Sequence, residues 1–156
     1  GCAYRELGEY QAAIESFEEA RGLYRKHKEI IHVARCDQKI ASCYNKLGDG
    51  EKALEKARIA LDVFETAHDN NRQLFTLFEY AKALELLGDH EEALATLDQV
   101  LTTASEDEPR DFEFIVEIES EIAAILRKSE RDEEAVEIER RLSSVRAILA
   151  DDESAE

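Results

Sequence analysis

One short pattern recurs along this chain at a nearly constant spacing, and it limits the fold more than any other feature. The segments RELGEYQAAIESFEEA, NKLGDGEKALEKARIA and ELLGDHEEALATLDQV each contain Leu-Gly, an acidic residue and then Ala followed by Ile or Leu. The glycines are Gly8, Gly48 and Gly88, and the alanines are Ala13, Ala53 and Ala93, in steps of 40 residues. A fourth copy, KSERDEEAVEIERRL, has Ala135 42 residues further on and Glu130 in place of the glycine. Such a period is typical of helical repeat arrays.

Each copy of the pattern predicts a helical hairpin. In KIASCYNKLG the apolar residues recur with the period of an amphipathic helix, at Ile40, Ala41, Tyr44 and Leu47. Gly48 follows in the position that ends such a helix, because glycine tolerates the left-handed backbone found there. A second stripe of the same period then begins at Ala53.

Small residues sit at matching places in successive copies. They are Ala41, Ala81 and Ala123 in the first helices, and Ala13, Ala53, Ala93 and Ala135 in the second. Two helices approach to about 8 Å only where their side chains are small. The alanines therefore predict the crossing points of antiparallel helices in an all-α fold.

These residues resemble the tetratricopeptide repeat family. In that family the first helix carries a small residue and, three positions later, an aromatic one, as in Ala41 and Tyr44, and the turn carries Gly-Asp or Gly-Glu, as in Gly48-Asp49. The second helix has the pattern found at Ala13, Ile14, Phe17 and Ala20. The resemblance covers essentially the whole chain. It implies a right-handed superhelical solenoid of antiparallel helical hairpins with about three and a half repeats.

The resemblance also implies repeat boundaries. The expected domain spans residues 1–150, with a truncated repeat at 1–29, full repeats at 30–69, 70–106 and 109–149, and an acidic tail at 151–156. Gly1 and Tyr4 would end the truncated first helix, and Gly8 would form the turn after it. Pro109 is expected in the first turn of the last first helix. The chain lacks methionine and begins with glycine, so we expect it to be a piece of a longer protein.

The chain departs from the family pattern in three ways. The tryptophan of the first helix is replaced by Asp37, Leu77 and Glu119, and the closing proline is absent. The repeat is 40 residues long, whereas the usual repeat has about 34. This length resembles the subfamily with elongated hairpins, which includes polarity adaptors, kinesin light chains and bacterial peptide-sensing regulators.

Charge and composition exclude several classes of partner. The formal net charge is −17, which repels the phosphates of nucleic acids and anionic lipid headgroups. No apolar run approaches the roughly 20 residues of a membrane span, and no signal-peptide pattern opens the chain. Cys2, Cys36 and Cys43 form no metal-spaced pair. We therefore expect reduced thiols, a cytoplasmic protein and no binding to membranes or nucleic acid.

The resemblance implies that first helices line a concave groove, and residues one step off the buried stripe are the candidates to face it. The predicted partner-binding residues are Arg5, Arg35, Gln38, Ser42, Asn45, Phe75, Phe78, Lys82 and Arg127. With Glu85 and Glu117 included, the predicted groove carries a charge of +2 and would attract a segment bearing carboxylates. The alternative is an ordinary solvated face, on which Lys82 and Glu85 pair along their helix.

The third first helix, LFTLFEYAKALELL, is apolar on nearly every side. One interpretation is a central helix covered by its neighbours. The other is that Phe75 and Phe78 anchor an apolar side chain of a ligand, with Asn45 and Arg35 holding its backbone. The clamp for acidic C-terminal tails that is known in the family needs Lys and Asn where this chain has Gln38, Ser42 and Glu79. That clamp is absent, so we do not expect a receptor for chaperone tails.

The sequence contains no pattern that indicates an enzyme, a cofactor or a metal. His27, His32, His68 and His90 are single, without the i, i+4 spacing of a helical metal site, and surface histidines explain them. Cys36 and Cys43 are expected to be small buried thiols. The basic cluster Arg21, Arg25, Lys26 and Lys28 complements the negative end of its helix or contacts an acidic partner.

The leading functional hypothesis is a protein-interaction scaffold that binds a peptide or helical segment of a partner. The alternative is a peptide-sensing regulatory domain of a larger transcriptional or signalling protein. Self-association is a further hypothesis, because the truncated first repeat would leave apolar surface at Tyr4 and Leu7 uncovered.

Overall fold

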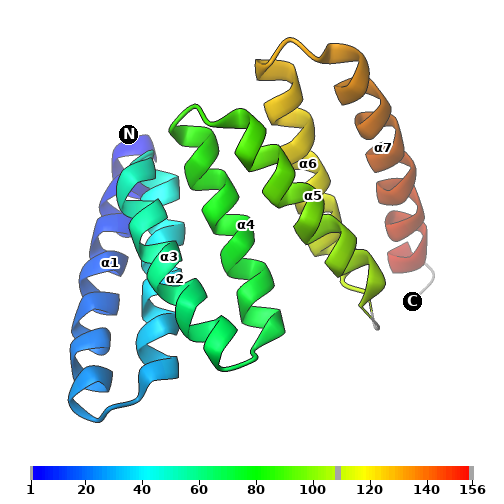
Figure 1. Ribbon diagram of the computed structural model, residues 1–156. Coiled ribbons are helices and arrows are strands. Elements are labelled where there is room, and N and C mark those ends of the chain that lie inside the picture. Colours follow the sequence, from blue (N-terminus) through cyan, green and yellow to red (C-terminus); the bar gives the residue numbers. More distant parts are fainter. Residues whose placement is uncertain (1, 108–109, 155–156) are drawn as a thin grey trace. The chain divides into compact units, whose positions relative to one another are not determined.

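A computed structural model of the chain describes the backbone of residues 2–107 and 110–154 and the side chains of residues 4–107 and 110–151. These residues form helices and no strand (Figure 1), which confirms the all-α prediction. The helices are α1 (Cys2–Lys26), α2 (Ile30–Leu47), α3 (Gly50–Thr66), α4 (Asn70–Leu86), α5 (His90–Glu106), α6 (Phe112–Lys128) and α7 (Asp132–Ser154). The predictions for Gly1, for Pro109 and for the side chain of Cys2 lie outside the described residues.

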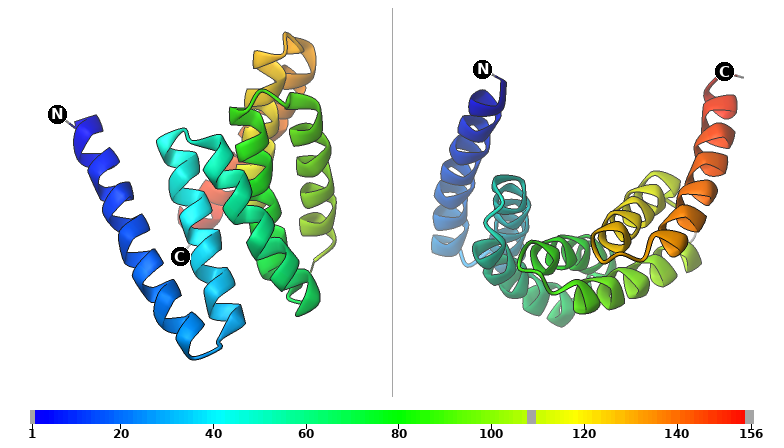
Figure 2. Two further views of the ribbon diagram at one scale, coloured as in Figure 1. Left: turned by 60° about the vertical axis from the view of Figure 1, so that its left-hand side comes forward. Right: turned by 90° about the horizontal axis from the view of Figure 1, so that it is seen from above.

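The chain divides into two compact units, Gly1–Thr96 and Leu97–Glu156. In unit 1, α1 packs on α2, α2 on α3 and α3 on α4, and α2 also contacts α4 directly. In unit 2, α6 packs on α7. In unit 1, and between α6 and α7 of unit 2, successive helices run antiparallel and are joined by short turns (Figure 2). The contacts of α4 with α3 and with α2 join neighbouring hairpins, and the contact of α2 with α4 is between two first helices.

The turns of unit 1 share one backbone geometry. Lys28, Gly48, His68 and Gly88 follow one another at 20-residue intervals, and all four have a positive φ, between 54° and 84°. The left-handed residue lets the next N–H groups bond back to the last carbonyls of the helix, as Gly48 N–H does to Asn45 O and Asp49 N–H to Tyr44 O. Gly48 and Gly88 thus end helices as predicted, and the structural period is half of the sequence period.

Aspartate precedes several of the helices, two of them after turns of unit 1 and one before α6 of unit 2. The carboxylates of Asp49, Asp69 and Asp111 accept hydrogen bonds from the N–H groups three residues on, at 3.2, 3.1 and 3.0 Å. Each bond satisfies one of the amide groups that the first turn of a helix leaves without a partner. The hydrogen bond from the Lys52 side chain, followed by that from its backbone, lowers the pKa of Asp49. The Gly-Asp pair of the turn therefore ends one helix and starts the next.

Replacing His68 by glycine should stabilise the protein. His68 has φ 54°, and a left-handed backbone costs a non-glycine residue about 1–2 kcal/mol. Glycine offsets about 0.5–1 kcal/mol of this gain, because it loses more conformational freedom on folding than histidine does. We expect His68→Gly to raise the free energy of unfolding by about 0.5–1 kcal/mol, measured by urea titration. Ala67→Gly is the control, since Ala67 has φ −80° and its replacement should destabilise; equal effects would contradict the argument.

The truncated first hairpin does not form as predicted. Helix α1 runs without a break from Cys2 to Lys26, through Gly8, which has no left-handed φ. A methyl group at Gly8 would meet nothing within 4 Å, so no described residue packs against that side of the helix. A helix needs a left-handed stop where a packed partner turns the chain back. Residues 4–9 are exposed, and continuing the helix keeps their backbone hydrogen bonds intact.

The core is built around the predicted small residues. Ala41, Ala53, Ala81, Ala93, Ala123 and Ala135 are buried, and Ala13 is half-buried beside the cluster of Ile14, Ile40 and Cys43. Cys36 and Cys43 are buried free thiols, as expected, and burial is the main cause that raises the pKa of each. In unit 2, helix α7 continues to Ser154, so the start of the acidic segment 151–156 is helical.

Candidate functional site

Helices α2 and α4 carry most of the predicted partner-binding residues, and a short polar network joins them. Asn45 Nδ2 donates to the backbone oxygen of Glu79 at 2.9 Å and to its Oε2 at 2.8 Å. At the start of α4, Arg35 of α2 lies near Asp69. Burial raises the pKa of Asp69, but the hydrogen bonds from Arg72 and the charges of Arg72 and Arg35 outweigh it and lower the pKa below its ordinary value. Asn45 and Glu79 are 34 residues apart in sequence, and so are Arg35 and Asp69. Because the same offset holds at both ends, α2 and α4 run parallel.

This parallel pairing brings several predicted residues onto neighbouring helices. Arg35 is exposed on α2, where Gln38 and Ser42 are half-buried. On α4, the side chain of Phe75 is 43% exposed, and Lys82 is half-buried. We refer to Arg35, Gln38, Ser42 and Phe75 as the α2–α4 face. It presents cationic, amide, hydroxyl and aromatic groups, which suit the backbone and side chains of a bound segment.

Two residues of the predicted set belong to the interior instead. Phe78 is only 6% exposed, so the prediction that it faces a groove is corrected: it packs in the core, with Lys82 Nζ 5.2 Å from its ring centre. Asn45 is buried as well, and its Nδ2 is committed to Glu79. Lys82 Nζ lies 3.8 Å from the same Glu79 carboxylate. The three polar groups tie α2 to α4, and they lie beneath the face instead of on it.

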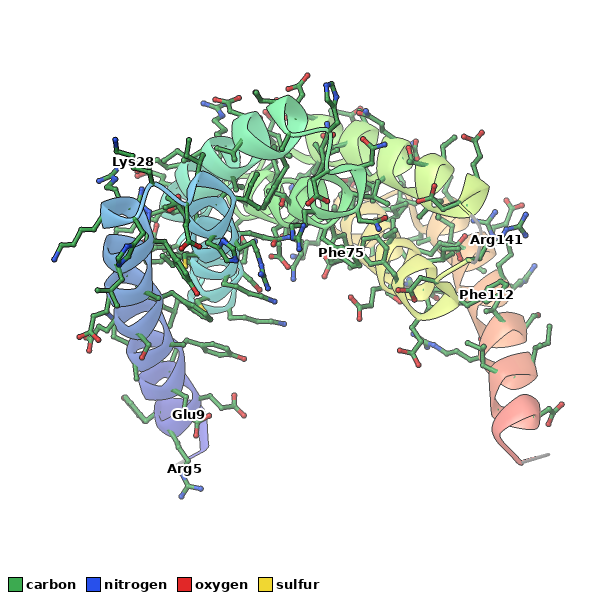
Figure 3. All side chains as sticks on the ribbon, turned by 90° about the horizontal axis from the view of Figure 1, so that it is seen from below. Arg5, Glu9, Lys28, Phe75, Phe112 and Arg141 are labelled. Atoms are coloured by element: carbon green, nitrogen blue, oxygen red, sulfur yellow. The ribbon has the colours of Figure 1, made fainter. Side chains whose placement is uncertain are left out.

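The remaining two predicted residues lie away from the α2–α4 face. Arg5 is exposed near the start of α1, at the opposite end of that helix from Lys28 (Figure 3). Arg127 belongs to unit 2, where its Nε and Nη2 donate to the two carboxylate oxygens of Glu139 at 2.7 and 2.6 Å. These bonds raise the pKa of the guanidinium and compensate its charge. The predicted excess of positive charge is therefore smaller than the sequence count indicated.

The buried carboxylate of Asp37 joins three helices. The sequence indicated Asp37 only as a departure from the family pattern. Asp37 of α2 is fully buried, with Arg21 Nε of α1 at 2.8 Å and Lys56 Nζ of α3 at 3.4 Å from its Oδ1. The N–H of Arg21 does not point along this line, so the contact is an ion pair without a directional hydrogen bond. Lys56 also donates to Glu18 at 2.8 Å. We call Glu18, Arg21, Asp37 and Lys56 the ion cluster.

The equivalent position of the last repeat follows the same principle. Glu119 of α6 is 9% exposed, and its Oε1 lies 3.0 Å from Arg141 Nη2 of α7. Leu77 occupies the matching position of α4 and is half-buried. The place that a large apolar side chain fills in the family is thus taken twice by a carboxylate with an arginine partner. The sequence pattern that could have predicted these buried ion pairs is a charged residue, Asp37 or Glu119, at a position of the buried apolar stripe.

The described residues hold no group of three or more His, Cys, Asp or Glu side chains that could bind a metal ion. Among the helices described, none is both long enough and apolar enough to cross a membrane.

The fold and its side chains define a helical repeat protein, in which paired helices of 17 to 25 residues cover one another. Family comparison agrees. Tetratricopeptide repeat profiles match residues 33–106 and residues 1–27. The chain belongs to the tetratricopeptide repeat family, as its sequence pattern indicated. A comparison with curated protein sequences finds no significant match.

Solved structures of the same architecture exist at low sequence identity. A candidate kinesin light chain of Podosopora anserina, with nearly identical TPR-like repeats, superimposes with a TM-score of 0.67 at 20% identity, covering 94% of this chain and 72% of that one. A single-residue variant of that protein gives a TM-score of 0.70 at 20% identity, with coverage of 92% and 69%. At this identity the likeness shows the fold alone. Tetratricopeptide repeats indicate a scaffold for protein interaction.

Proposed function

We propose that this chain binds an extended or helical segment of a partner polypeptide on the α2–α4 face. The observation that carries the proposal is the parallel pairing of two first helices, which places an exposed aromatic side chain and an exposed cation on neighbouring elements. Binding of this kind would serve a scaffold. It would equally serve the peptide-sensing regulatory domain that the sequence offers as an alternative, because sensing begins with binding.

The rigidity of the support favours this face. The Asn45 amide fixes α2 against α4 through two bonds to Glu79, and Phe78 and Leu74 fill the space beneath α4. A preformed surface loses little conformational entropy on binding. Phe75 therefore stands on a fixed helix, and burying its ring under a ligand would contribute about 1.5–3 kcal/mol. The buried, reduced Cys36 and Cys43 fit the reducing compartment that we propose for the protein, the cytoplasm.

A peptide library displayed on phage tests the proposal. Segments selected on the immobilised chain should lose roughly ten-fold or more in affinity for Phe75→Ala, the factor expected from about 1.4 kcal/mol or more of lost apolar burial. The affinity would be measured by fluorescence polarisation with the selected peptides.

Phe112 of α6 supplies a matched control at a different place on the molecule (Figure 3). It is 49% exposed, against 43% for Phe75. Phe112→Ala should leave the affinities of the selected peptides within about two-fold of the parent. Selected peptides that bind both variants as tightly as the parent would show that the α2–α4 face is not the binding surface.

A further inference from the structure

Phe75 and Leu86 share the solvent-facing side of α4. Eleven residues separate them in the sequence, and eleven residues of an α-helix make about three turns, which brings the two side chains to within roughly 20° of the same direction. Phe75 and Leu86 are each 43% exposed. Glu79 and Lys82 lie between them on the same side and are half-buried. We call Phe75, Glu79, Lys82 and Leu86 the α4 stripe.

The middle of the α4 stripe is polar and already paired. Lys82 Nζ lies 3.8 Å from the carboxylate of Glu79 and 5.2 Å from the centre of the Phe78 ring. Glu79 also accepts the hydrogen bond from Asn45 of α2. These contacts hold the side chains of Glu79 and Lys82 down, so that they are only 15% and 18% exposed. The stripe therefore offers two apolar contacts, separated by polar groups whose charges are compensated.

The distance between the two apolar ends decides which kind of segment fits the stripe. At a rise of 1.5 Å per residue, eleven residues place Phe75 and Leu86 about 16 Å apart along α4. In an extended strand this distance corresponds to about five residues, and residues five apart point to opposite faces. A helix that lies along α4 matches both the distance and the direction with residues eleven apart. The stripe therefore favours a helical segment over an extended one.

The matching positions of α2 are basic. Arg35 and Lys46 stand 40 residues before Phe75 and Leu86, and both are exposed. The acidic residue of α2, Asp37, is buried in the ion cluster. Because α2 and α4 run parallel, the two cations follow the α4 stripe on its α2 side. Positive charge along one side of a binding surface selects a partner that carries negative charge there.

The acidic groups of α4 and its first turn do not cancel this charge. The carboxylate of Asp69 accepts a hydrogen bond from the backbone of Arg72 and pairs with its guanidinium. Glu79 is engaged within the stripe. Glu85 is half-buried and is turned about 100° around α4 from Leu86. The exposed charge that α2 places beside the stripe is therefore positive.

We propose that the α2–α4 face binds an acidic amphipathic helix of a partner protein, at least about three turns long, which lies along α4. Two apolar residues of that helix, eleven apart, contact Phe75 and Leu86, and acidic residues on its α2 side pair with Arg35 and Lys46. The inference rests on the proposed function, that this face binds a polypeptide segment, and it names the conformation and the chemistry of that segment. Leu86 is the second apolar anchor of the site.

Leu87 gives a matched control for Leu86. The two neighbours are 46% and 43% exposed, and Leu87 points about 100° away around the helix axis. Twenty-residue segments selected on phage for their dependence on Phe75 should lose about five-fold or more in affinity with Leu86→Ala, and about two-fold or less with Leu87→Ala, in fluorescence polarisation. Urea titration checks that the variants are folded, and Leu86→Gln replaces Leu86→Ala if it is not. Equal losses for the two positions would overturn the proposal.

The selected segments themselves test the helical conformation. A proline midway between the two apolar anchors breaks an α-helix, and it should weaken binding about ten-fold or more, whereas alanine at the same position should change the affinity about two-fold or less. An extended segment accepts the proline, because it has no helical hydrogen bond to lose. Proline and alanine segments that bind equally well would show that the ligand is not a helix.

Charge reversal tests the orientation of the acidic side. Arg35→Glu and Lys46→Glu should each weaken binding about five-fold or more. Lys26 is exposed at the end of α1, so Lys26→Glu makes the same change in net charge away from the stripe and should alter the affinity by about two-fold or less. If Lys26→Glu weakens binding as much as the other two, the segment responds to overall charge and does not pair along α2.

Failure of this inference is separable from failure of the proposed function. If the selected segments depend on Phe75, ignore Leu86→Ala and accept the proline, the face binds polypeptide and only the helical ligand is wrong. If the library yields no segment that is sensitive to Phe75→Ala, both proposals fail.

Discussion

Replacing Asp37 by alanine should lower the free energy of unfolding by about 2–4 kcal/mol. The substitution removes the buried anion that Arg21 of α1 and Lys56 of α3 approach, at 2.8 and 3.4 Å. Breaking a fully buried ion pair costs about 3–5 kcal/mol, because the remaining charge is left uncompensated. The side chains of Arg21 and Lys56 are 17% and 16% exposed, so both reach some water and Glu18, which reduces the loss. Urea titration followed by circular dichroism measures it.

Two further variants separate charge from packing. Asp62→Ala removes an exposed carboxylate of α3 and should change stability by no more than about 0.5 kcal/mol. Combining Asp37→Leu with Arg21→Met and Lys56→Met replaces the three least exposed members of the ion cluster by apolar groups and leaves Glu18, whose side chain is 41% exposed. This variant should recover most of the stability, since buried charge networks are often exchanged for apolar groups at little cost. Leu77 shows that an apolar residue fits the equivalent position of α4. An Asp37→Ala loss no larger than that of Asp62→Ala would mean that the cluster does not bind the helices together.

The sequence was sufficient for the repeat, the turns and the small-residue crossings, because each of these is a local property. A glycine such as Gly48 predicts a helix end with a left-handed backbone, and an alanine such as Ala53 predicts close helix packing. Neither prediction depends on the rest of the chain. The unbroken α1 could not be foreseen in the same way. Whether Gly8 ends a helix depends on a neighbour that turns the chain back, and no local pattern reports that neighbour.

The candidate site was predicted less well, for a geometric reason. Residues three apart on a helix differ in direction by roughly 60°, from the period of 3.6 residues. A difference of this size places Phe75 at the surface and Phe78 in the core. It is too small for the sequence pattern to tell which of the two is exposed. The carboxylate that Arg127 bonds most closely, Glu139, lies 12 residues away, and the partners of Asp37 lie 16 or more residues away. All of them belong to other helices. Periodicity gives no information on which charges meet across a helix pair.

Gly50 should tolerate no side chain, although it stands in the first turn of a helix where alanine is normally the better residue. A Cβ atom at Gly50 would lie 3.0 Å from the backbone oxygen of Ala83, 3.0 Å from Leu86 Cβ and 3.1 Å from Leu87 Cγ, all at the end of α4. These distances are below ordinary van der Waals contact, and a backbone oxygen cannot rotate away. The end of α4 would have to move away from α3 to admit even one methyl group.

Gly22 provides the opposite case with the same substitution. It lies inside α1, and a Cβ atom there would meet nothing within 4 Å. Gly22→Ala should therefore raise the free energy of unfolding by about 0.5–1 kcal/mol, the helix-propensity difference between the two residues. Gly50→Ala should lower it by about 1–2 kcal/mol, since overpacking costs about 1–3 kcal/mol and the propensity gain offsets part of it. Urea titration of both variants beside the parent measures whether each substitution raises or lowers the free energy of unfolding. If Gly50→Ala stabilised the protein as much as Gly22→Ala, then α3 and α4 would not approach as closely as this packing requires, and the contact that joins the second hairpin to the third would be looser than the structure shows.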